Sequence, residues 1–397
     1  MPRSVRARRG NGLYLQIYPS SLENASRMGK IGRAAQDSGV FSATHLVGVG
    51  TGLEPAEEDL GAGLLVVRLP ARKFSGGTLG RVLRVAVWYS RVLGRYGREP
   101  VSLIAAHSVW VLPLCWVLSK RTGSKLIYNA HELETETISM FGMKKKIAQR
   151  IEALLIGRCA VVSVVNEPIA EWYEHRYGMS RPVVVGNTPV MVDSHEGLRE
   201  RLGVGPDPLL FIHTGHLVVG RNIPLILKAF HGSPHHLVFL GDGPYKDDIV
   251  KAGQRSPNIH WLPPVPHDRI VSNVREADVG LCLIEIHQDL SDQLSSPNKL
   301  LESLAAGIPA LCTDLVEARR LMGELAEGWI LSDPETELST VLETIDRSRV
   351  TVFKQAWGGL PSWDEEVASW VQAITGVVGP SAPPRGVMPH EVDLRQD

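Results

Sequence analysis

Short apolar runs alternate with amphipathic, helix-like segments along the first half of the chain. Runs rich in Val, Ile and Leu that are separated by helices are typical of a parallel sheet covered on both faces. No period of 20–50 residues recurs, which argues against a solenoid. The predicted strands are Leu13–Tyr18, Thr44–Val49, Leu64–Leu69, Val101–Ala106, Lys125–Asn129, Ala160–Val165 and Pro182–Val185.

The second half repeats this alternation. Helices are predicted over 335–347 and from Ser362 onward. With 397 residues, the chain is long enough for two α/β domains of ordinary size. The predicted strands are Leu209–Thr214, His235–Leu240, Asn258–Leu262, Ala277–Ile284, Pro309–Thr313 and Trp329–Leu331.

Residues 291–314, SDQLSSPNKLLESLAAGIPALCTD, predict a loop, a helix and a short buried strand. Ser296 suits the N-cap and Pro297 suits the first helical position. The unpaired N–H groups and the dipole of a helix N-terminus favour a phosphate, and Lys299 adds a positive charge in the first turn. Glu302, one turn further, could accept hydrogen bonds from sugar hydroxyls. Taken alone, the segment is equally consistent with a solvated surface helix.

The whole string resembles the SPNKLFEYMAAGxPV segment of retaining glycosyltransferases of family 4 (glycosyl transferases group 1). The resemblance implies the GT-B fold, which has two Rossmann-like, doubly wound parallel-sheet domains facing a central cleft. It also implies that Glu302 binds the nucleotide ribose and that Ser296, Pro297 and Asn298 meet the donor diphosphate. One position departs from the family, because Leu294 stands where many members have a Glu that contacts the donor sugar.

Two further strings resemble donor-binding segments of the same family. GHLVVGRNIPLILKAF is similar to GRLxxxKGxxxLIxAF, and it begins at Gly215. Its family Arg and Lys, which hold the diphosphate, are replaced by His216 and Arg221. Arg221 keeps the charge, whereas a histidine can be neutral at pH 7. LGDGP, with Gly241 and Gly243, resembles the family's LVGDGP, although two glycines also suit an ordinary turn.

Three places in the first half follow predicted strands, at the sheet edge where ligands of such folds bind. NAHE resembles the DxHE motif, whose His faces the donor sugar, and this assigns that role to His131. His107 follows the preceding strand and is a weaker candidate, because a lone His is more often structural. Ser26 and Arg27, at the end of the loop after the first strand, are expected on the acceptor side, and His107 is a further candidate for that side.

The sequence contains no DxD motif, so we expect no metal and no cofactor besides the nucleotide-sugar co-substrate. Arg221 and Lys299 would then stabilise the charge on the departing phosphate, with His131 as the third catalytic candidate. The resemblance implies a hexosyl- or other glycosyltransferase (EC 2.4) that retains the anomeric configuration. Acceptors in related enzymes that build cell-surface polysaccharides and glycolipids include lipid-linked glycans.

Two alternatives remain open. A nucleotide-sugar 2-epimerase would share the two-domain architecture, but the HRREN-like segment associated with these enzymes is absent. A non-catalytic, nucleotide-sugar-binding partner of another transferase is favoured by Leu294 and His216. Four residues argue against that second alternative: Arg221, Lys299, Glu302 and His131.

Charge is divided unevenly between the two halves. The net charge is −1, yet residues 1–190 carry +11 and residues 191–397 carry −12. A basic helix predicted over Leu79–Gly97 has Arg81, Arg84, Arg91 and Arg95 along one face, and Trp88 and Tyr89 suit an interface. These features favour an anionic membrane surface as a partner. No aromatic-interleaved basic motif or zinc-finger spacing indicates nucleic acid.

Compartment and domain limits follow from the remaining patterns. The four cysteines are widely spaced, and no apolar run reaches about 20 residues, so we expect a cytoplasmic protein, peripheral on the inner face of the membrane.

The predicted division is an acceptor-side domain 1–188, a linker 189–207, a donor-binding domain 208–360, a C-terminal helix 361–375 that crosses back to the first domain, and a disordered tail 376–397.

Overall fold

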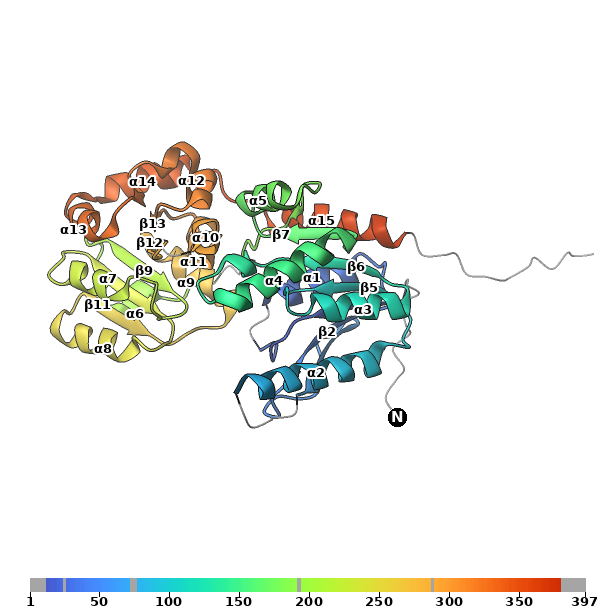
Figure 1. Cartoon of the computed structure of the whole chain (residues 1–397). Coiled ribbons are helices and arrows are strands. Elements are labelled where there is room, and N and C mark those ends of the chain that lie inside the picture. The colour runs from blue at the N-terminus through green and yellow to red at the C-terminus, as the bar shows by residue number, and fades with distance from the viewer. Residues whose placement is uncertain (1–11, 24–25, 72–76, 191–193, 287–288, 380–397) are drawn as a thin grey trace, which may run out of the picture. The chain divides into compact units, whose positions relative to one another are not determined.

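A computed structural model describes residues 12–23, 26–71, 77–190, 194–286 and 289–379 of the chain (Figure 1). The described residues form two compact units. The first unit consists of 12–105, 117–125 and 374–379, and the second consists of 106–116 and 126–373. The domain limits predicted from the sequence stay predictions.

The first unit is built on strands in the order β3-β4-β2-β1-β5. Strands β1, β2 and β4 pair in parallel, whereas the short β3 runs antiparallel to β4 at the edge. The strands are β1 (Leu13–Ile17), β2 (Ala43–Gly50), β3 (Glu57–Asp59), β4 (Leu64–Pro70) and β5 (Val101–Ala106).

The second unit contains the neighbouring strands β6-β7-β8 and a separate parallel sheet in the order β11-β10-β9-β12-β13-β14. The strands are β6 (Lys125–Asn129), β7 (Val161–Val164), β8 (Val183–Val184), β9 (Leu210–Thr214), β10 (His236–Leu240), β11 (Ile259–Leu262), β12 (Val279–Cys282), β13 (Ala310–Thr313) and β14 (Ile330–Leu331).

Helices separate most of the strands, as the alternating pattern predicts. The α-helices are α1 (Ser26–Asp37), α2 (Gly77–Tyr96), α3 (Leu112–Thr122), α4 (Gly142–Leu155), α5 (Glu167–Tyr177), α6 (Leu198–Leu202), α7 (Ile223–Phe230), α8 (Lys246–Arg255), α9 (Ile270–Arg275), α10 (Leu290–Gln293), α11 (Asn298–Ala305), α12 (Val316–Met322), α13 (Pro334–Thr344), α14 (Arg347–Ala356) and α15 (Trp363–Val378). The turn η1 (Glu134–Glu136) is a 3₁₀ helix.

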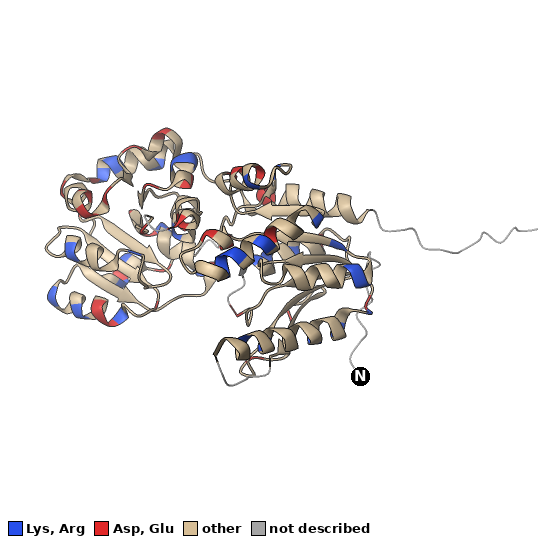
Figure 2. Ribbon diagram, in the orientation of Figure 1, with Lys and Arg blue, Asp and Glu red and all other residues tan. Residues whose placement is uncertain are grey.

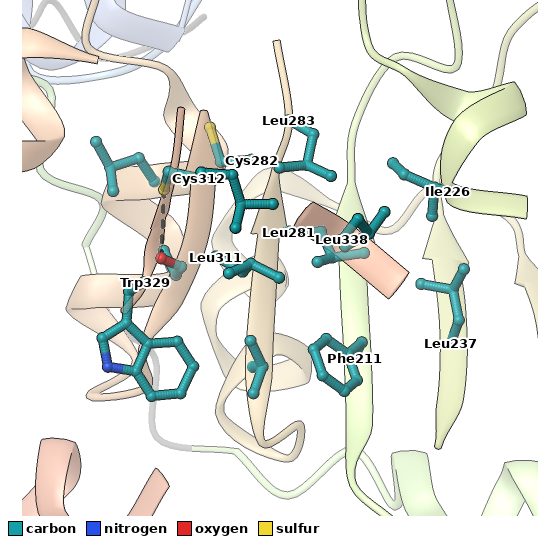
Figure 3. Close-up of a cluster of buried hydrophobic side chains, with 14 of the residues drawn as sticks. Phe211, Ile226, Leu237, Leu281, Cys282, Leu283, Leu311, Cys312, Trp329 and Leu338 are labelled. Atoms are coloured by element: carbon teal, nitrogen blue, oxygen red, sulfur yellow. Dashed lines mark hydrogen bonds between the residues drawn. The ribbon is translucent and has the colours of Figure 1, made fainter. Parts of the chain in front are cut away.

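The β9–β14 sheet is buried on both faces, which explains why its strands read as continuous apolar runs. On one face Phe211 and Leu281 pack with Ile226 of α7 and Leu338 of α13 (Figure 3). On the other face Ile212 packs in a second cluster with residues of α6 and α9. Both clusters hold the carboxyl ends of β9 and β12 in fixed positions.

Every apolar run predicted as a strand is a strand in the structure, and the prediction of a parallel α/β fold is confirmed. Strand β3 was not predicted, because Glu57–Asp59 is acidic and exposed. Helix α15 continues to Val378, past the predicted end of the last helix. Residues 24–25, 191–193 and 380–397, which fall in the acceptor loop, the linker and the predicted tail, lie outside the described residues.

Candidate donor-binding site

The N-terminus of α11 begins one residue later than the sequence predicts. Pro297 is the N-cap residue rather than the first helical residue, and no side chain caps the helix. The amides of Leu300 and Leu301 donate to the carbonyl of Pro297. Among the described residues, the amides of Asn298 and Lys299 have no acceptor. Two backbone donors therefore remain for a ligand at this end of the helix.

The loop before α11 is held by two asparagine side chains. Nδ2 of Asn166 donates to the carbonyl of Leu294 at 2.6 Å and to Oγ of Ser296 at 2.9 Å. Nδ2 of Asn187 donates to Oδ1 of Asn298 at 3.0 Å. Because Ser296 takes part in this contact, it is not the helix cap that its position in the sequence suggests.

Two cations, Lys299 and Arg221, lie near this helix end. Neither Lys299 nor Arg221 forms an ion pair with any described carboxylate, and Nη1 of Arg221 reaches only the carbonyl of Gly220. Burial lowers the pKa of Lys299, the nearby Arg221 lowers it further, and Cys282 and Glu302 oppose these effects. A partly buried pair of positive charges of this kind is stabilised by an anion.

The loop that starts at Gly215 lies against Lys299. A methyl group built on Gly215, whose φ is +84°, would lie 3.8 Å from Nζ of Lys299. A Cβ on Gly241 would clash with the Gly215 carbonyl, and one on Gly243 would meet the backbone of Leu217. These two glycines therefore let the loop cross the end of β10 closely, while their predicted contact with the donor stays a prediction. His216 in this loop is exposed.

Glu302 is buried beside the two cations. Its Oε2 accepts a hydrogen bond from the hydroxyl of Thr214 at 2.6 Å, and only 5% of the residue is exposed. Burial raises the pKa of Glu302, while the Thr214 hydrogen bond and Lys299 oppose the rise. His213, on the neighbouring β9 position, is also buried, and burial followed by Lys299 and Arg221 holds its pKa well below the ordinary value. This imidazole therefore adds no charge to the site at neutral pH.

His107 and His131, which the sequence places after two separate strands, are in direct contact. Nδ1 of His107 lies 2.7 Å from Nε2 of His131, and Nδ2 of Asn129 lies 3.3 Å from Nε2 of His107. His107 is 2% exposed and His131 is half-buried. The structure brings these candidates together, and it adds Asn129, whose role the motif comparison did not single out.

Two glutamates of the same segment were not selected from the sequence. Glu134 accepts from the hydroxyl of Ser108 and from the amide of Val109, both at 2.7 Å. Glu132 is exposed, yet desolvation, followed by repulsion from Glu134, raises its pKa, and Arg221 opposes the shift. The only sequence signal for Glu132 was its place in the NAHE string.

A carboxylate also lies two residues before Leu294. Asp292, in the short helix α10, is half-buried, and its side chain accepts no hydrogen bond from the described residues. Desolvation, then Asp289, raises its pKa, and Arg221 opposes the shift. Asp289 itself caps α10 and accepts from the amide of Ile138 at 2.8 Å. Sequence comparison alone offered no reason to select Asp292.

Two of the acceptor-side candidates, Ser26 and Arg27, lie at the start of α1 in the first unit. Ser26 is its first residue, and its side chain lies outside the described part of the structure. Arg27 follows it and is buried, with 8% of the residue exposed. Their predicted role toward an acceptor stays a prediction.

The first half of α2, also in the first unit, is exposed on nearly all sides. Leu79, Val82, Leu83 and Val85 are 71, 58, 42 and 48% exposed. The prediction that Trp88 lies at an interface is wrong, because Trp88 is 2% exposed and donates from Nε1 to the carbonyl of Gly48.

In the second unit, α4 carries a run of basic side chains, Lys144 to Lys146 (Figure 2). The exposed Met143, Ile147 and Leu154 lie at helical spacing on the same helix.

None of the described helices is long and apolar enough to cross a bilayer. Within the described ranges, no group of three His, Cys, Asp or Glu side chains could hold a metal ion.

Comparison with known proteins identifies two consecutive family matches. Residues 25–188 match the "Glycosyl transferase 4-like domain", and residues 210–347 match "Glycosyl transferases group 1". A relative in Bacillus subtilis (strain 168), named "Putative teichuronic acid biosynthesis glycosyltransferase TuaC", is 25% identical over 181 residues. That match spans 43% of this chain and 42% of the relative.

Solved structures share the fold over almost the whole chain. The sucrose-phosphate synthase of Thermosynechococcus elongatus has a TM-score of 0.69 at 12% identity, covering 92% of this chain and 99% of that chain. Anabaena HepE in complex with UDP-glucose has a TM-score of 0.64 at 14% identity, covering 92% and 98%. With the two family matches, this likeness establishes that the chain belongs to the GT-B glycosyltransferases of family 4 (glycosyl transferases group 1).

Proposed function

We propose that the protein transfers a sugar from a nucleotide-sugar donor to an acceptor. The observation that carries this proposal is the pair of cations Lys299 and Arg221, which form no ion pair with a described carboxylate, together with two α11 amides that have no acceptor among the described residues. Two fixed cations and two N–H groups suit a diphosphate. The buried carboxylate of Glu302, one helical turn further, suits the hydroxyls of the adjoining ribose. The solved HepE complex with UDP-glucose supports a donor of this class.

The chemistry follows from where charge develops. As the bond between the sugar and the phosphate breaks, negative charge builds on the departing diphosphate. In this proposal Lys299, Arg221 and the α11 amides bind the diphosphate, and their stabilisation of it increases as its negative charge grows in the transition state. We infer that no metal is required, because these groups supply the positive charge. Retention of configuration is part of the proposal and rests on the family resemblance.

His131 and Asp292 are the groups that we assign to the donor sugar. His131 lies after β6 beside His107. Asp292 offers a carboxylate close to the position where Leu294 replaces the family's sugar-binding Glu. A carboxylate without a hydrogen-bond partner among the described residues is suited to accept sugar hydroxyls. Glu132, whose pKa is raised, is a further candidate for proton transfer near the acceptor.

We propose that the acceptor is a cell-surface glycan precursor carried on a lipid at the inner face of the membrane. The relative TuaC, named for teichuronic acid biosynthesis, supports this class of product. The exposed apolar side chains of α2 are accompanied by Arg81 and Arg84. An anionic membrane surface would cover the apolar groups and neutralise the arginines.

Mass analysis of reaction products tests the proposal. The purified protein is incubated with single nucleotide sugars in the presence of EDTA, with and without lipid-linked glycan. We expect nucleoside diphosphate together with free sugar or glycosylated acceptor. An epimerised sugar would support the 2-epimerase alternative, and intact donor that nevertheless binds would support a non-catalytic partner. Turnover only after Mg²⁺ or Mn²⁺ is restored would contradict the metal-independent mechanism.

A further inference from the structure

Four polar side chains of the second unit form one hydrogen-bonded line at β6 and β7. The hydroxyl of Ser163 donates to Oδ1 of Asn129, whose Nδ2 lies 3.3 Å from Nε2 of His107. Nδ1 of His107 then lies 2.7 Å from Nε2 of His131. Ser163 and Asn129 are each 1% exposed, and His107 is 2% exposed. Since water does not compete at these buried contacts, each hydrogen bond needs a donor and an acceptor from the protein itself.

The amide of Asn129 determines which atom donates and which accepts in the neighbouring hydrogen bonds. Its Oδ1 faces the Ser163 hydroxyl, so its Nδ2 faces His107. An amide nitrogen is only a donor, and Nε2 of His107 must therefore present its lone pair. A neutral His107 consequently carries its proton on Nδ1.

The same argument extends to the second ring. The contact of 2.7 Å between Nδ1 of His107 and Nε2 of His131 holds one proton, and the rings meet edge to face at 88°. Since His107 supplies this proton, Nε2 of His131 is the acceptor. A neutral His131 therefore carries its own proton on Nδ1.

We propose that Asn129 and His107 are positioning residues that hold His131 in the Nδ1–H tautomer. The consequence for catalysis rests on the proposed glycosyl transfer. In this tautomer Nδ1 of His131 carries an N–H rather than a basic lone pair, so this nitrogen is a hydrogen-bond donor and not a base. His131 does not remove a proton through Nε2, because that nitrogen is occupied by His107.

The tautomer can be measured without any assumption about activity. We would record long-range ¹H–¹⁵N spectra of the histidine rings in the full chain near pH 8, above the ordinary histidine pKa of about 6.5. His107→Gln and His131→Gln would assign the signals. We expect protonated Nδ1 and unprotonated Nε2 in both rings. A protonated Nε2 in either ring, or averaged signals from both tautomers, would overturn the proposal.

Asn129→Asp reverses the polarity of the first contact with little change in shape. Its carboxylate only accepts, so Nε2 of His107 should become protonated. We also expect turnover to fall at least tenfold, with affinity for the nucleoside diphosphate changed less than twofold. Asn273→Asp, a buried change whose partner is the backbone carbonyl of Arg269, just before α9, should leave the His107 signals as in the wild type.

An unchanged His107 spectrum in folded Asn129→Asp would contradict the assignment. If this variant does not fold, the wild-type spectrum alone decides the question. Failure to find any donor turnover would refute the proposed function and leave the tautomer result intact, so the two failures are distinguishable.

Discussion

Thr214, the last residue of β9, and Glu302, in the middle of α11, are joined by a hydrogen bond of 2.6 Å although they are 88 residues apart in the chain. Both residues are buried, at 4% and 5% exposed. The bond fixes Oε2 of Glu302. Its Oε1 accepts no hydrogen bond from the described residues and is therefore the atom that we assign to the ribose hydroxyls.

Replacing Glu302 by Gln should weaken donor binding by about 1–3 kcal/mol, the usual effect of losing a charge-assisted hydrogen bond. Because burial raises the pKa of Glu302, wild-type affinity should decline as the pH falls through that raised pKa, and the variant should lack this decline. Calorimetric titration at several pH values measures both effects. Equal donor affinity in the wild type and Glu302→Gln would contradict the assignment of Glu302 to the ribose.

Lys299→Ala and Arg221→Ala should each weaken binding of the nucleoside diphosphate by about 1.5–3 kcal/mol, because each removes a charged donor. Lys251→Ala, an exposed change on α8, is the matched control and should bind as the wild type does. Competition with a fluorescent nucleotide measures all three. If Lys251→Ala weakens binding as much as Lys299→Ala, the loss reflects the net charge of the protein, and the assignment of Lys299 to the diphosphate is contradicted.

His131→Ala should reduce transfer at least tenfold while leaving affinity for the nucleoside diphosphate within about twofold. The reason is that we assign His131 to the sugar and not to the nucleotide. Steady-state kinetics and diphosphate binding are compared on the same preparation. Parallel losses in both quantities would indicate that the residue is needed only for local structure.

Glu152 provides a prediction about stability. It is fully buried in the second unit and accepts hydroxyl hydrogen bonds from Tyr128, Tyr173 and Tyr177 at 2.9, 2.7 and 2.6 Å. Desolvation raises its pKa in spite of these bonds. The folded state therefore binds this proton more tightly than the unfolded state, whose Glu pKa is about 4.3.

The contribution of Glu152 to stability is accordingly present below the unfolded pKa and is lost as the pH rises through the folded pKa. Urea unfolding of the wild type and Glu152→Gln at pH 4.5 and 7.5 tests the sign. The unfolding free energy of Glu152→Gln minus that of the wild type should be larger at pH 7.5 than at pH 4.5. A constant difference, or movement in the other direction, would show that the three tyrosines outweigh desolvation.

If the protein docks on a membrane, it should bind anionic vesicles but not neutral ones. This binding should weaken as the salt concentration rises. Arg91 and Arg95 already contact the Pro70 carbonyl and Glu99, so Arg81 and Arg84 are the informative pair. Changing both to Gln should weaken vesicle binding by about 1 kcal/mol each. Lys228→Gln with Lys251→Gln, two exposed changes on α7 and α8, is the charge-matched control. Equal sedimentation with neutral vesicles would contradict this account.

The sequence was sufficient for the strands because nearly all of them are buried on both faces and therefore read as apolar runs. Strand β3 was not predicted because its three acidic residues are exposed. Its pairing with β4 depends on contacts such as Glu58 with Arg68. The N-cap prediction at Ser296 failed because Asn166, 130 residues away, bonds its hydroxyl. Trp88 was misplaced for a similar reason, since its acceptor is the distant Gly48 carbonyl.

The candidate site was predicted in part. Motif comparison selected Lys299, Arg221, Glu302 and His131, and the structure adds that both cations lack an ion-pair partner among the described carboxylates. The contact between His107 and His131, and the carboxylate of Asp292, depend on how distant segments pack. Such contacts leave no local pattern in the chain.

Binding of nucleotide sugars to the wild type and to Lys299→Ala tests the central claim most directly. A panel of donors with different bases and sugars would be titrated by calorimetry, with the free nucleoside diphosphates as competitors. We expect one donor class to bind the wild type, its nucleoside diphosphate to compete, and Lys299→Ala to bind at least tenfold more weakly. Absence of binding across the panel, or equal binding to the two proteins, would contradict a donor diphosphate site at the N-terminus of α11.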